Sequence, residues 1–515
     1  MGTIIIYTAV AALFFLMIAK YDIHMFQLSS YRYSRYFRWL VPGNIISRNR
    51  IFALLMVVPV IFPNYIGVGF ATGITAGAWL VALREKFKTP LVYTMRVKRL
   101  FATTIILFAA ITALALLFAG KWAIAAISAL LLLSNFIMLL ANFVNTPIEK
   151  AINRGYYNDA KRIIESNKNL IIIGVTGSFG KTSTKNYLAS VLAEKYNVLV
   201  TPGNYNTLLG VIRTIREQLR PYHQVFIVEM GAKQKNDIKE ICDLVHPSIG
   251  IVTAVGEMHL ETFKTVANIQ DTKFELINSL PANGLGIINY DSEYIKNYNG
   301  ITSKCKIIKY AVENNADYKA SDVQYGASGV EFTLNGEQSY SSRLLGAGNL
   351  LNILAAIAAA NHLDVPLNKQ KNAIARLQPV EHRLSMKVAN GITVLDDAYN
   401  SNPQGAKMAL EVLRNFNVGE GNKRIVITPG FVEMGIRQAS ANKELGTVIA
   451  KSCDYAIVVN ATNRDAIKSG IDEGGLPEGK CFLADSLNHA HAHLAQILKP
   501  GDVVLYENDL PDNFK

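Results

Sequence analysis

Residues 171–185 read IIIGVTGSFGKTSTK, and this stretch decides the fold of the region around it. An apolar β-branched run, typical of a buried strand, leads into the glycine-rich loop TGSFGKT at 176–182 and then into a helical pattern. A loop in this position aims its backbone N–H groups and the positive end of the helix dipole at phosphate oxygens. The pattern predicts a parallel α/β sheet with a nucleotide-binding loop, although Val175 replaces the first glycine of the strict motif.

The loop residues have separate expected roles. Lys181 is expected to meet the β- and γ-phosphates of a nucleotide, and the Thr182 hydroxyl is expected to ligate Mg²⁺. The other loop residues expected to contact the cofactor are Thr176, Gly177, Ser178, Gly180 and Ser183. The predicted cofactors are therefore ATP and Mg²⁺, and the alternative interpretation is an ordinary strand-to-helix turn.

The positive charge of the chain is local. The net charge is +12, and residues 20–50 and 84–100 each carry six Lys or Arg residues against a single acid. The apolar residues are concentrated in the first 145 positions, so both basic stretches lie between apolar segments. This pattern indicates membrane topology, and no nucleic-acid partner is expected.

Four uncharged apolar segments predict a transmembrane region of about five helices over residues 1–145. These segments are 3–19, 51–83, 101–119 and 122–144. As one helix, 51–83 would be about 50 Å long, whereas a bilayer core is about 30 Å thick, so Pro63-Asn64 is expected to separate two short spans. Five spans place both basic stretches and the rest of the chain on one side. The positive-inside rule then predicts a multi-pass cell-membrane protein with cytoplasmic catalytic domains.

Beyond the apolar region, strand-like and helical patterns alternate, which predicts parallel α/β sheets. After a polar helical linker at 146–168, a central domain is expected at 169–384 and a Rossmann-like C-terminal domain at 385–515. The central domain also contains an alternating stretch at 317–345, where Asn335-Gly336 favours a hairpin, followed by a helix at 349–362. The predicted parallel strands are 169–175, 197–201, 224–229, 249–255 and 285–289, and then 392–397, 424–428, 454–460 and 501–506.

Polar residues follow several of these strands, where ligands of such sheets bind. Glu229 ends the strand VFIVE and could hold a metal or polarise a water, or it could cap a helix. His259 follows the strand at 249–255 between Glu257 and Glu261, and Lys273 lies beyond it on a predicted helix. The loop TPGNYNT at 201–207 and the cluster LDDAYNSNP at 395–403 also follow strands.

Taken in order, these motifs resemble those of the Mur ligase family, the ATP-dependent amide-bond ligases of peptidoglycan assembly. The resemblance covers about residues 165–505 and is closest to the branch that adds D-alanyl-D-alanine to UDP-N-acetylmuramoyl-tripeptide. The predicted spans stand where soluble members have a small UDP-sugar-binding domain. The motifs are TGSFGKTS at 176–183, TPGNYNT at 201–207, VEMGA at 228–232, HLE at 259–261, DTKFE at 271–275, GNLLN at 348–352 and LDDAYNSNP at 395–403.

The resemblance implies roles for individual residues. Catalytic roles fall on Lys181, Glu229, His259, Lys273 and Arg383. Mg²⁺ would be held by Thr182, Glu229, His259 and Lys273, the last matching a lysine that is carbamylated in the family. The adenine side of the site would include Asn289, Asn349 and Asn352. From the C-terminal domain, the residues closing over ATP would be Arg383, Asp397, Tyr399 and Asn400.

The resemblance also implies a reaction and its partners. A peptide carboxylate would attack the γ-phosphate of ATP, and an amine such as D-alanyl-D-alanine would attack the resulting acyl phosphate. The acceptor would be a muropeptide, either UDP-linked or lipid-linked, and other cell-wall synthesis proteins are possible partners.

Two alternatives remain open at this stage. One keeps the ligase chemistry but builds another peptide polymer, such as poly-γ-glutamate. The other is an ATP-driven transporter or membrane regulator, against which the lack of ionisable residues in the predicted spans argues.

Overall fold

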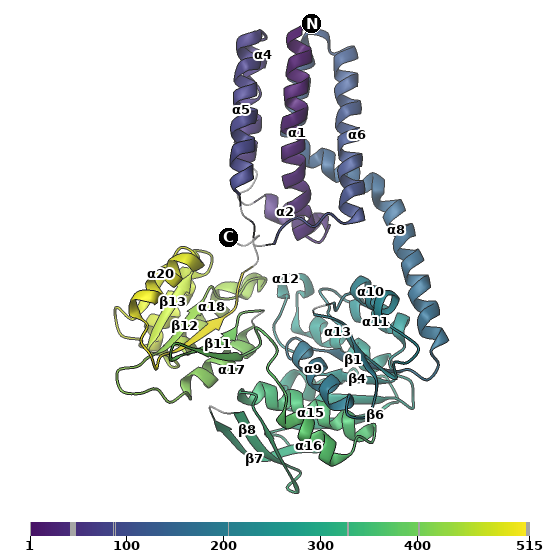
Figure 1. The fold of residues 1–515 in the computed structure, drawn as a ribbon, viewed down its shortest axis with the longest axis vertical. Helices are drawn as coiled ribbons and strands as arrows, with labels where there is room; N and C mark the ends of the chain where they lie inside the picture. Colours follow the sequence, from purple (N-terminus) through teal and green to yellow (C-terminus); the bar gives the residue numbers. More distant parts are fainter. Residues whose placement is uncertain are drawn as a thin grey trace. The chain divides into compact units, whose positions relative to one another are not determined.

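The computed structural model describes residues 2–41, 48–85, 87, 89–203, 205–326, 329–399 and 402–510. The chain forms two compact units, a helical unit that ends at Gly155 and an α/β unit that spans Tyr156–Leu510. Figure 1 shows the helical unit in purple and blue and the α/β unit in teal to yellow.

Three helices of the helical unit are long and apolar enough to cross a membrane, among the residues described. They are α1 (Gly2–Leu28), α5 (Tyr65–Arg84) and α6 (Met95–Phe118). A fourth span is possible if α7 (Ala123–Leu132) and α8 (Ser134–Ser166), which meet at a 73° bend, count as one broken span. The shorter helices are α2 (Tyr33–Leu40), α3 (Arg48–Leu55), α4 (Val58–Ile61) and η1 (Gly120–Trp122).

By length and composition alone the described helices give three or four candidate spans, whereas the sequence predicts about five, and the difference lies in the segment before Pro63-Asn64. The turn expected at Pro63-Asn64 is present, where the Asn64 side chain accepts hydrogen bonds from two backbone N–H groups at the start of α5. The segment before this turn holds only the 8-residue α3 and the 4-residue α4. Pro59 explains the break, because a proline disfavours helical geometry in the residue before it and has no N–H to donate.

The helices α1 and α5 run in the same direction. Five spans require this arrangement, because the chain must then cross back once between these two helices. Trp79 of α5 donates to the carbonyl of Leu13 in α1 (3.2 Å), and beyond α5 the carbonyl of Val92 accepts from Gln27 near the end of α1 (2.9 Å). The chain must therefore return between the two helices, through α3 and α4.

Both basic stretches lie at one end of the helical unit. Arg48 of the first stretch forms an ion pair with Glu85 of the second (3.1 Å). Near this end, the buried Asp22 of α1 pairs with Arg50 (2.9 Å) and accepts a hydrogen bond from Ser134 (2.8 Å). Asp22 lies inside α1 but beyond the uncharged segment 3–19 that was expected to span the membrane.

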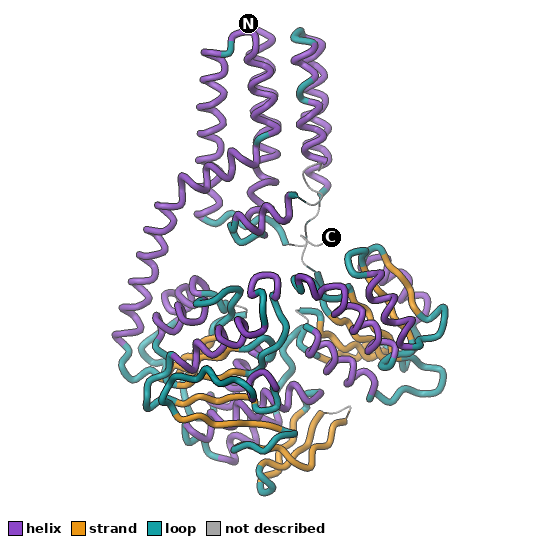
Figure 2. The backbone as a smooth tube through the Cα atoms, turned by 180° about the vertical axis from the view of Figure 1, so that it is seen from behind, coloured by secondary structure: helices purple, strands orange, loops and turns teal. Residues whose placement is uncertain are grey.

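The first sheet of the α/β unit is mainly parallel, as predicted. Its order is β2-β3-β1-β4-β5-β6-β7-β8-β9, and β1 pairs with β3 and β4 through Ile171↔Val225 and Ile173↔Ile249. The central strands β1, β3 and β4 are mainly apolar because helices cover both of their faces (Figure 2). The strands are β1 (Ile171–Thr176), β2 (Val198–Val200), β3 (Val225–Glu229), β4 (Ile249–Val252), β5 (Leu285–Asn289), β6 (Lys306–Ala311), β7 (Tyr318–Gly326), β8 (Gly329–Leu334) and β9 (Gln338–Ser342).

One face of this sheet packs against α9, α15 and α16, and the other against α10, α11 and α13. The antiparallel extension β7-β8-β9 confirms the expected hairpin, with Asn335 and Gly336 at positive φ in its turn. The helices are α9 (Lys181–Leu192), α10 (Leu208–Gln218), α11 (Asp237–Val245), α12 (Leu260–Phe263), α13 (Val266–Asn278), α14 (Glu293–Lys296), α15 (Gly346–His362) and α16 (Leu367–Ala375).

A second sheet follows, with the order β10-β11-β15-β12-β13-β14 and only β10 antiparallel. Its strands are β10 (Ser385–Ala389), β11 (Ile392–Asp397), β12 (Arg424–Thr428), β13 (Tyr455–Val459), β14 (Cys481–Ala484) and β15 (Val503–Glu507). Its helices are α17 (Pro403–Arg414), η2 (Gly435–Arg437), α18 (Gln438–Ala450), α19 (Arg464–Gly474) and α20 (Leu487–Ile497). The expected α/β fold class is confirmed.

Candidate active site

The loop after β1 is built around two glycines and one threonine. Gly177 (φ 157°) and Gly180 (φ 81°) adopt backbone geometry that L-residues rarely take. A Cβ on Gly177 would lie 2.0 Å from Thr253 Oγ1. The Thr253 hydroxyl hydrogen-bonds the carbonyl oxygen of Phe179 (2.5 Å), which ties the loop to the end of β4.

Lys181 is the first residue of α9, and its ammonium group folds back on the loop. It donates to the carbonyl oxygens of Gly177 (2.6 Å) and Ser178 (3.2 Å). Burial lowers the pKa of Lys181 to about 8, with Glu229 acting in the opposite direction and Arg383 adding to the decrease. The side chains of Lys181, Thr182 and Ser183 line one hollow with Arg383, so the loop faces a residue from beyond α16.

Glu229 ends β3 and is 1% exposed. Its Oε1 accepts a hydrogen bond from Asn206 Nδ2 (3.0 Å), and its Oε2 lies 3.1 Å from Lys185 Nζ. Burial by itself raises the pKa of Glu229, but the charges of Lys185 and Lys181 outweigh it, so the pKa lies below its usual range. Oε2 is buried and already paired with the Lys185 ammonium group, so a metal ion bound here would share this oxygen with Lys185.

Lys185 is the residue of this site that the sequence interpretation missed. It is 1% exposed and, besides pairing with Glu229, donates to the carbonyl oxygens of Thr201 (2.8 Å) and Gly203 (2.7 Å). It therefore joins the loop after β2 to the end of β3. Its position four residues after Lys181 was a usable signal, because it places both ammonium groups on one side of α9.

Lys273 and His259 lie on the other side of the loop. Lys273 in α13 is 4% exposed, and burial, followed by the charge of Lys181, lowers its pKa to about 7. His259 precedes α12, with its Nδ1 2.5 Å from Glu433 Oε2. Burial lowers the pKa of His259 although Glu433 opposes this, and the charge of Lys273 also acts on it.

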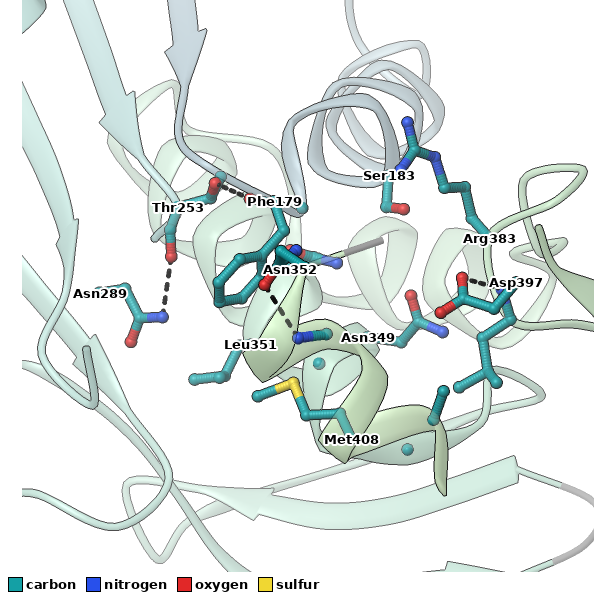
Figure 3. A pocket seen from close by; sticks show the side chains of 17 residues that line it. Phe179, Ser183, Thr253, Asn289, Asn349, Leu351, Asn352, Arg383, Asp397 and Met408 are labelled. Atoms are coloured by element: carbon teal, nitrogen blue, oxygen red, sulfur yellow. Dashed lines mark hydrogen bonds between the residues drawn. The ribbon is translucent and has the colours of Figure 1, made fainter. Parts of the chain in front are cut away.

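A pocket next to the loop gathers half of the residues expected to bind the nucleotide (Figure 3). Asn349 and Asn352 of α15 are held by hydroxyl donors on α9, namely Tyr187 (2.9 Å) and Thr184 (3.0 Å). Asn289, at the end of β5, donates to the carbonyl oxygen of Thr253 (2.8 Å). The three asparagines thus line the pocket and also fix the elements around it.

Two of the residues expected to close over ATP, Arg383 and Asp397, line the same pocket. Both come from the segment that begins the second sheet. Asp397, at the end of β11, accepts a hydrogen bond from the backbone N–H of Leu384 (3.0 Å), and burial raises its pKa to about 6 against the effect of Arg383. The Arg383 guanidinium lies over the ring of Tyr399, 4.2 Å from its centroid. Tyr399 is 42% exposed, and Asn400 lies outside the described residues.

The predicted metal ligands fit a magnesium site in their chemistry. A threonine hydroxyl and a buried carboxylate oxygen are the hard ligands that Mg²⁺ prefers, and Thr182 and Glu229 provide them. Among the described residues, no three His, Cys, Asp or Glu side chains converge, so a site here would also need ligands of another kind.

The electrostatic balance of the site is strongly positive. Lys181, Lys185 and Arg383 all act on the carboxylate of Glu229. The charge of Lys181 also acts on Lys273, while Asp397 is a second, partly buried carboxylate that acts on Arg383. In a buried site, such an excess of cations is costly until an anion of high charge binds. This arrangement is suited to a polyphosphate.

Comparison with known proteins agrees with this geometry. The profile of the Mur ligase middle domain matches residues 175–360, and that of the Mur ligase glutamate ligase domain matches residues 382–506. The chain belongs to the Mur ligase family. This Mur ligase is an ATP-dependent enzyme that forms amide bonds in cell-wall precursor synthesis, as the motifs predicted. Neither profile extends into the helical unit.

Among its relatives are two enzymes named UDP-N-acetylmuramoyl-tripeptide–D-alanyl-D-alanine ligase. The one from Bacillus subtilis is 30% identical over 65% of this chain and 72% of its own length. The one from Haemophilus influenzae is 31% identical over 67% and 72%. Solved structures of MurF from Acinetobacter baumannii (TM-score 0.62, 68% of this chain and 76% of that chain) and of MurF from Thermotoga maritima with ADP (0.61, 69% and 80%) share the fold at 24% identity.

The buried Lys185–Glu229 pair gives a prediction about stability. Lys185→Met should lower the free energy of unfolding by about 3–5 kcal/mol, because it leaves a buried carboxylate without its partner. The pKa of Glu229 is lowered in the folded protein, so its contribution is complete above the unfolded pKa of about 4.3 and is lost as the pH falls through the folded value. Thermal unfolding followed by circular dichroism at pH 7 measures the full effect.

Two further variants make that experiment decisive. Lys239→Met removes an exposed lysine that pairs with Asp243 (2.8 Å), and it should lower the free energy of unfolding far less than Lys185→Met does. Lys185→Met combined with Glu229→Leu removes both charges and should recover most of the lost stability. A single variant as stable as Lys239→Met would contradict the role given to the buried pair.

Proposed function

We propose that this ligase joins D-alanyl-D-alanine, or a similar amine, to the peptide carboxylate of a muramoyl precursor. The observation that carries the proposal is the cluster of cations around Glu229 at the phosphate-binding loop. The names of the relatives from B. subtilis and H. influenzae support the identity of the substrates.

In the proposed reaction the chain binds and aligns ATP and the peptide. The Lys181 ammonium group leaves the carbonyl oxygens of its own loop and neutralises the β- and γ-phosphates, and Arg383 reaches them from the other side of the hollow. A carboxylate oxygen of the peptide attacks the γ-phosphorus, which releases ADP and leaves an acyl phosphate. The amine then attacks the acyl carbon, and inorganic phosphate leaves. Positioning and charge neutralisation supply most of the catalysis.

Thr182, Glu229, His259 and Lys273 would hold Mg²⁺, which neutralises charge on the transferring phosphoryl group. Lys273 could serve as an anionic ligand after reaction with CO₂. A lysine with a pKa of about 7 is roughly half neutral at pH 7, and the neutral amine is the form that reacts with CO₂. Burial thus favours the reaction of Lys273 with CO₂. It also favours metal binding by the oxygen atoms of the carbamate that forms.

We further propose that the helical unit anchors the enzyme in the cell membrane with the catalytic domains in the cytoplasm. Both basic stretches lie at one end of this unit, and the positive-inside rule assigns such an end to the cytoplasm. An enzyme held there has access to lipid-linked precursors as well as to soluble nucleotides.

The ligase proposal is tested with detergent-purified protein, ATP, Mg²⁺, D-alanyl-D-alanine and either UDP-N-acetylmuramoyl-tripeptide or its lipid-linked counterpart. Mass spectrometry should find a pentapeptide product, together with phosphate release. Lys181→Ala and Lys273→Ala should each lose at least 100-fold in rate, and added bicarbonate should not restore the latter.

The outcome of that assay separates the alternatives. If only one of the two acceptors gives product, that acceptor, UDP-linked or lipid-linked, is the substrate of the enzyme. No product from either acceptor, with ADP still bound, would contradict the muropeptide assignment. Activity on glutamate under those conditions would favour a polymer such as poly-γ-glutamate.

The membrane orientation is tested by cysteine labelling in intact cells. A cysteine at Asn64, in the turn before α5, should react with a membrane-impermeant maleimide, whereas a cysteine at Arg35 in α2 should react only after the cells are opened. Of the four native cysteines, all in the α/β unit, three are buried, and the half-buried Cys481 serves as the internal cytoplasmic control. Labelling of the cysteine at 35 in intact cells would contradict the proposed orientation.

A further inference from the structure

The residue that holds His259 comes from the other half of the α/β unit. His259 belongs to the segment matched by the Mur middle domain, whereas Glu433 follows β12 in the segment matched by the glutamate ligase domain. His259 Nδ1 lies 2.5 Å from Glu433 Oε2, and the backbone N–H of Glu261 donates to the carbonyl oxygen of Glu433 (3.3 Å). One glutamate therefore contacts the histidine and the start of α12 together.

A second contact flanks the first. Arg437 of η2 donates to Glu257 (2.8 Å), two residues before His259, so the contact involves both ends of the His259 segment. His259 (φ 52°) and Glu433 (φ 62°) both have left-handed backbone geometry, which is strained for non-glycine residues and persists only where the surrounding structure enforces it. Figure 1 shows α12 at the side of the first sheet nearest α18, which follows η2 directly.

The chemistry of this contact is that of an oriented metal ligand. A histidine that binds a metal through one ring nitrogen usually donates its other N–H to a carboxylate, which fixes the tautomer and the rotation of the ring. Glu433 receives Nδ1–H here, so Nε2 carries the lone pair. In the described part of the chain Nε2 makes no hydrogen bond, and the charge of Lys273, another expected ligand, acts on this imidazole.

We propose that Glu433 is a positioning residue that orients His259 toward the metal from the C-terminal domain. The metal site is then complete only while the two domains are in contact, so closure of the C-terminal domain and metal binding depend on each other. This inference rests on the proposed role of His259 as a metal ligand. A merely structural ion pair between the domains would hold them together without orienting the histidine ring.

The test measures binding of Mn²⁺, as a probe for Mg²⁺, to the full-length protein with ADP, by electron paramagnetic resonance. Glu433→Ala should weaken Mn²⁺ binding by 10- to 100-fold while ADP binding without metal changes less than twofold. Glu433→Gln keeps an acceptor for Nδ1–H and should recover part of the affinity. The matched control is Glu444→Ala, which removes another carboxylate bound to Arg437 (3.2 Å) without touching His259, and should bind Mn²⁺ normally.

His259→Ala separates this inference from the proposed function. If His259→Ala weakens Mn²⁺ binding and Glu433→Ala does not, the positioning role is wrong and the metal site stands. If His259→Ala has no effect, His259 is not a ligand, and the inference fails with that assignment. Equal losses in Glu433→Ala and Glu444→Ala would identify a structural contact between domains and would also overturn the positioning role.

Discussion

The constraint on which this site depends is one buried carboxylate facing an excess of cations. Glu229 is buried at the end of β3, with Lys185 at ion-pair distance and with Lys181 and Arg383 close enough to act on its charge. Such a group is stable only if each charge has a partner, and the protein supplies too few of them. A polyphosphate with its metal supplies the missing charge partners. The charges around the loop therefore favour binding of the ligand that the reaction consumes.

The fold produces this arrangement by bringing distant segments to the same edge of a sheet. The phosphate-binding loop follows β1, Glu229 ends the adjacent β3, and Thr253 follows β4 on the other side. The second sheet adds Asp397, next to the Arg383 that precedes it. Because one site draws on both sheets, relative movement of the two domains can open it to substrate and complete it for reaction. The helical unit adds a membrane anchor to this chemistry in the proposed account.

Much of this could be predicted from the sequence, because local patterns determined it. Apolar runs ending in polar residues located β1, β3, β4, β5 and β11, and the loop at 176–182 was visible as a motif. The strands β6 and β10 were missed because lysines interrupt their apolar runs, and β14 was missed because it has only four residues at the edge of its sheet. Glu433 was missed because its role depends on a partner 174 residues away, whereas Lys185, whose partner is 44 residues away, could have been found from its spacing to Lys181. The count of about five spans stays a prediction, because Pro59 divides a segment that is apolar throughout into the short helices α3 and α4.

The central claim is that ATP activates a peptide carboxylate by phosphorylation. The most direct measurement starts from a muramoyl tripeptide with ¹⁸O in its terminal carboxylate and follows the label during ligation by mass spectrometry. The account predicts that one ¹⁸O atom enters each inorganic phosphate released, because a carboxylate oxygen bonds to the γ-phosphorus and leaves with it. Phosphate released without label, while ATP is consumed, would mean that water attacks the nucleotide and would contradict the account.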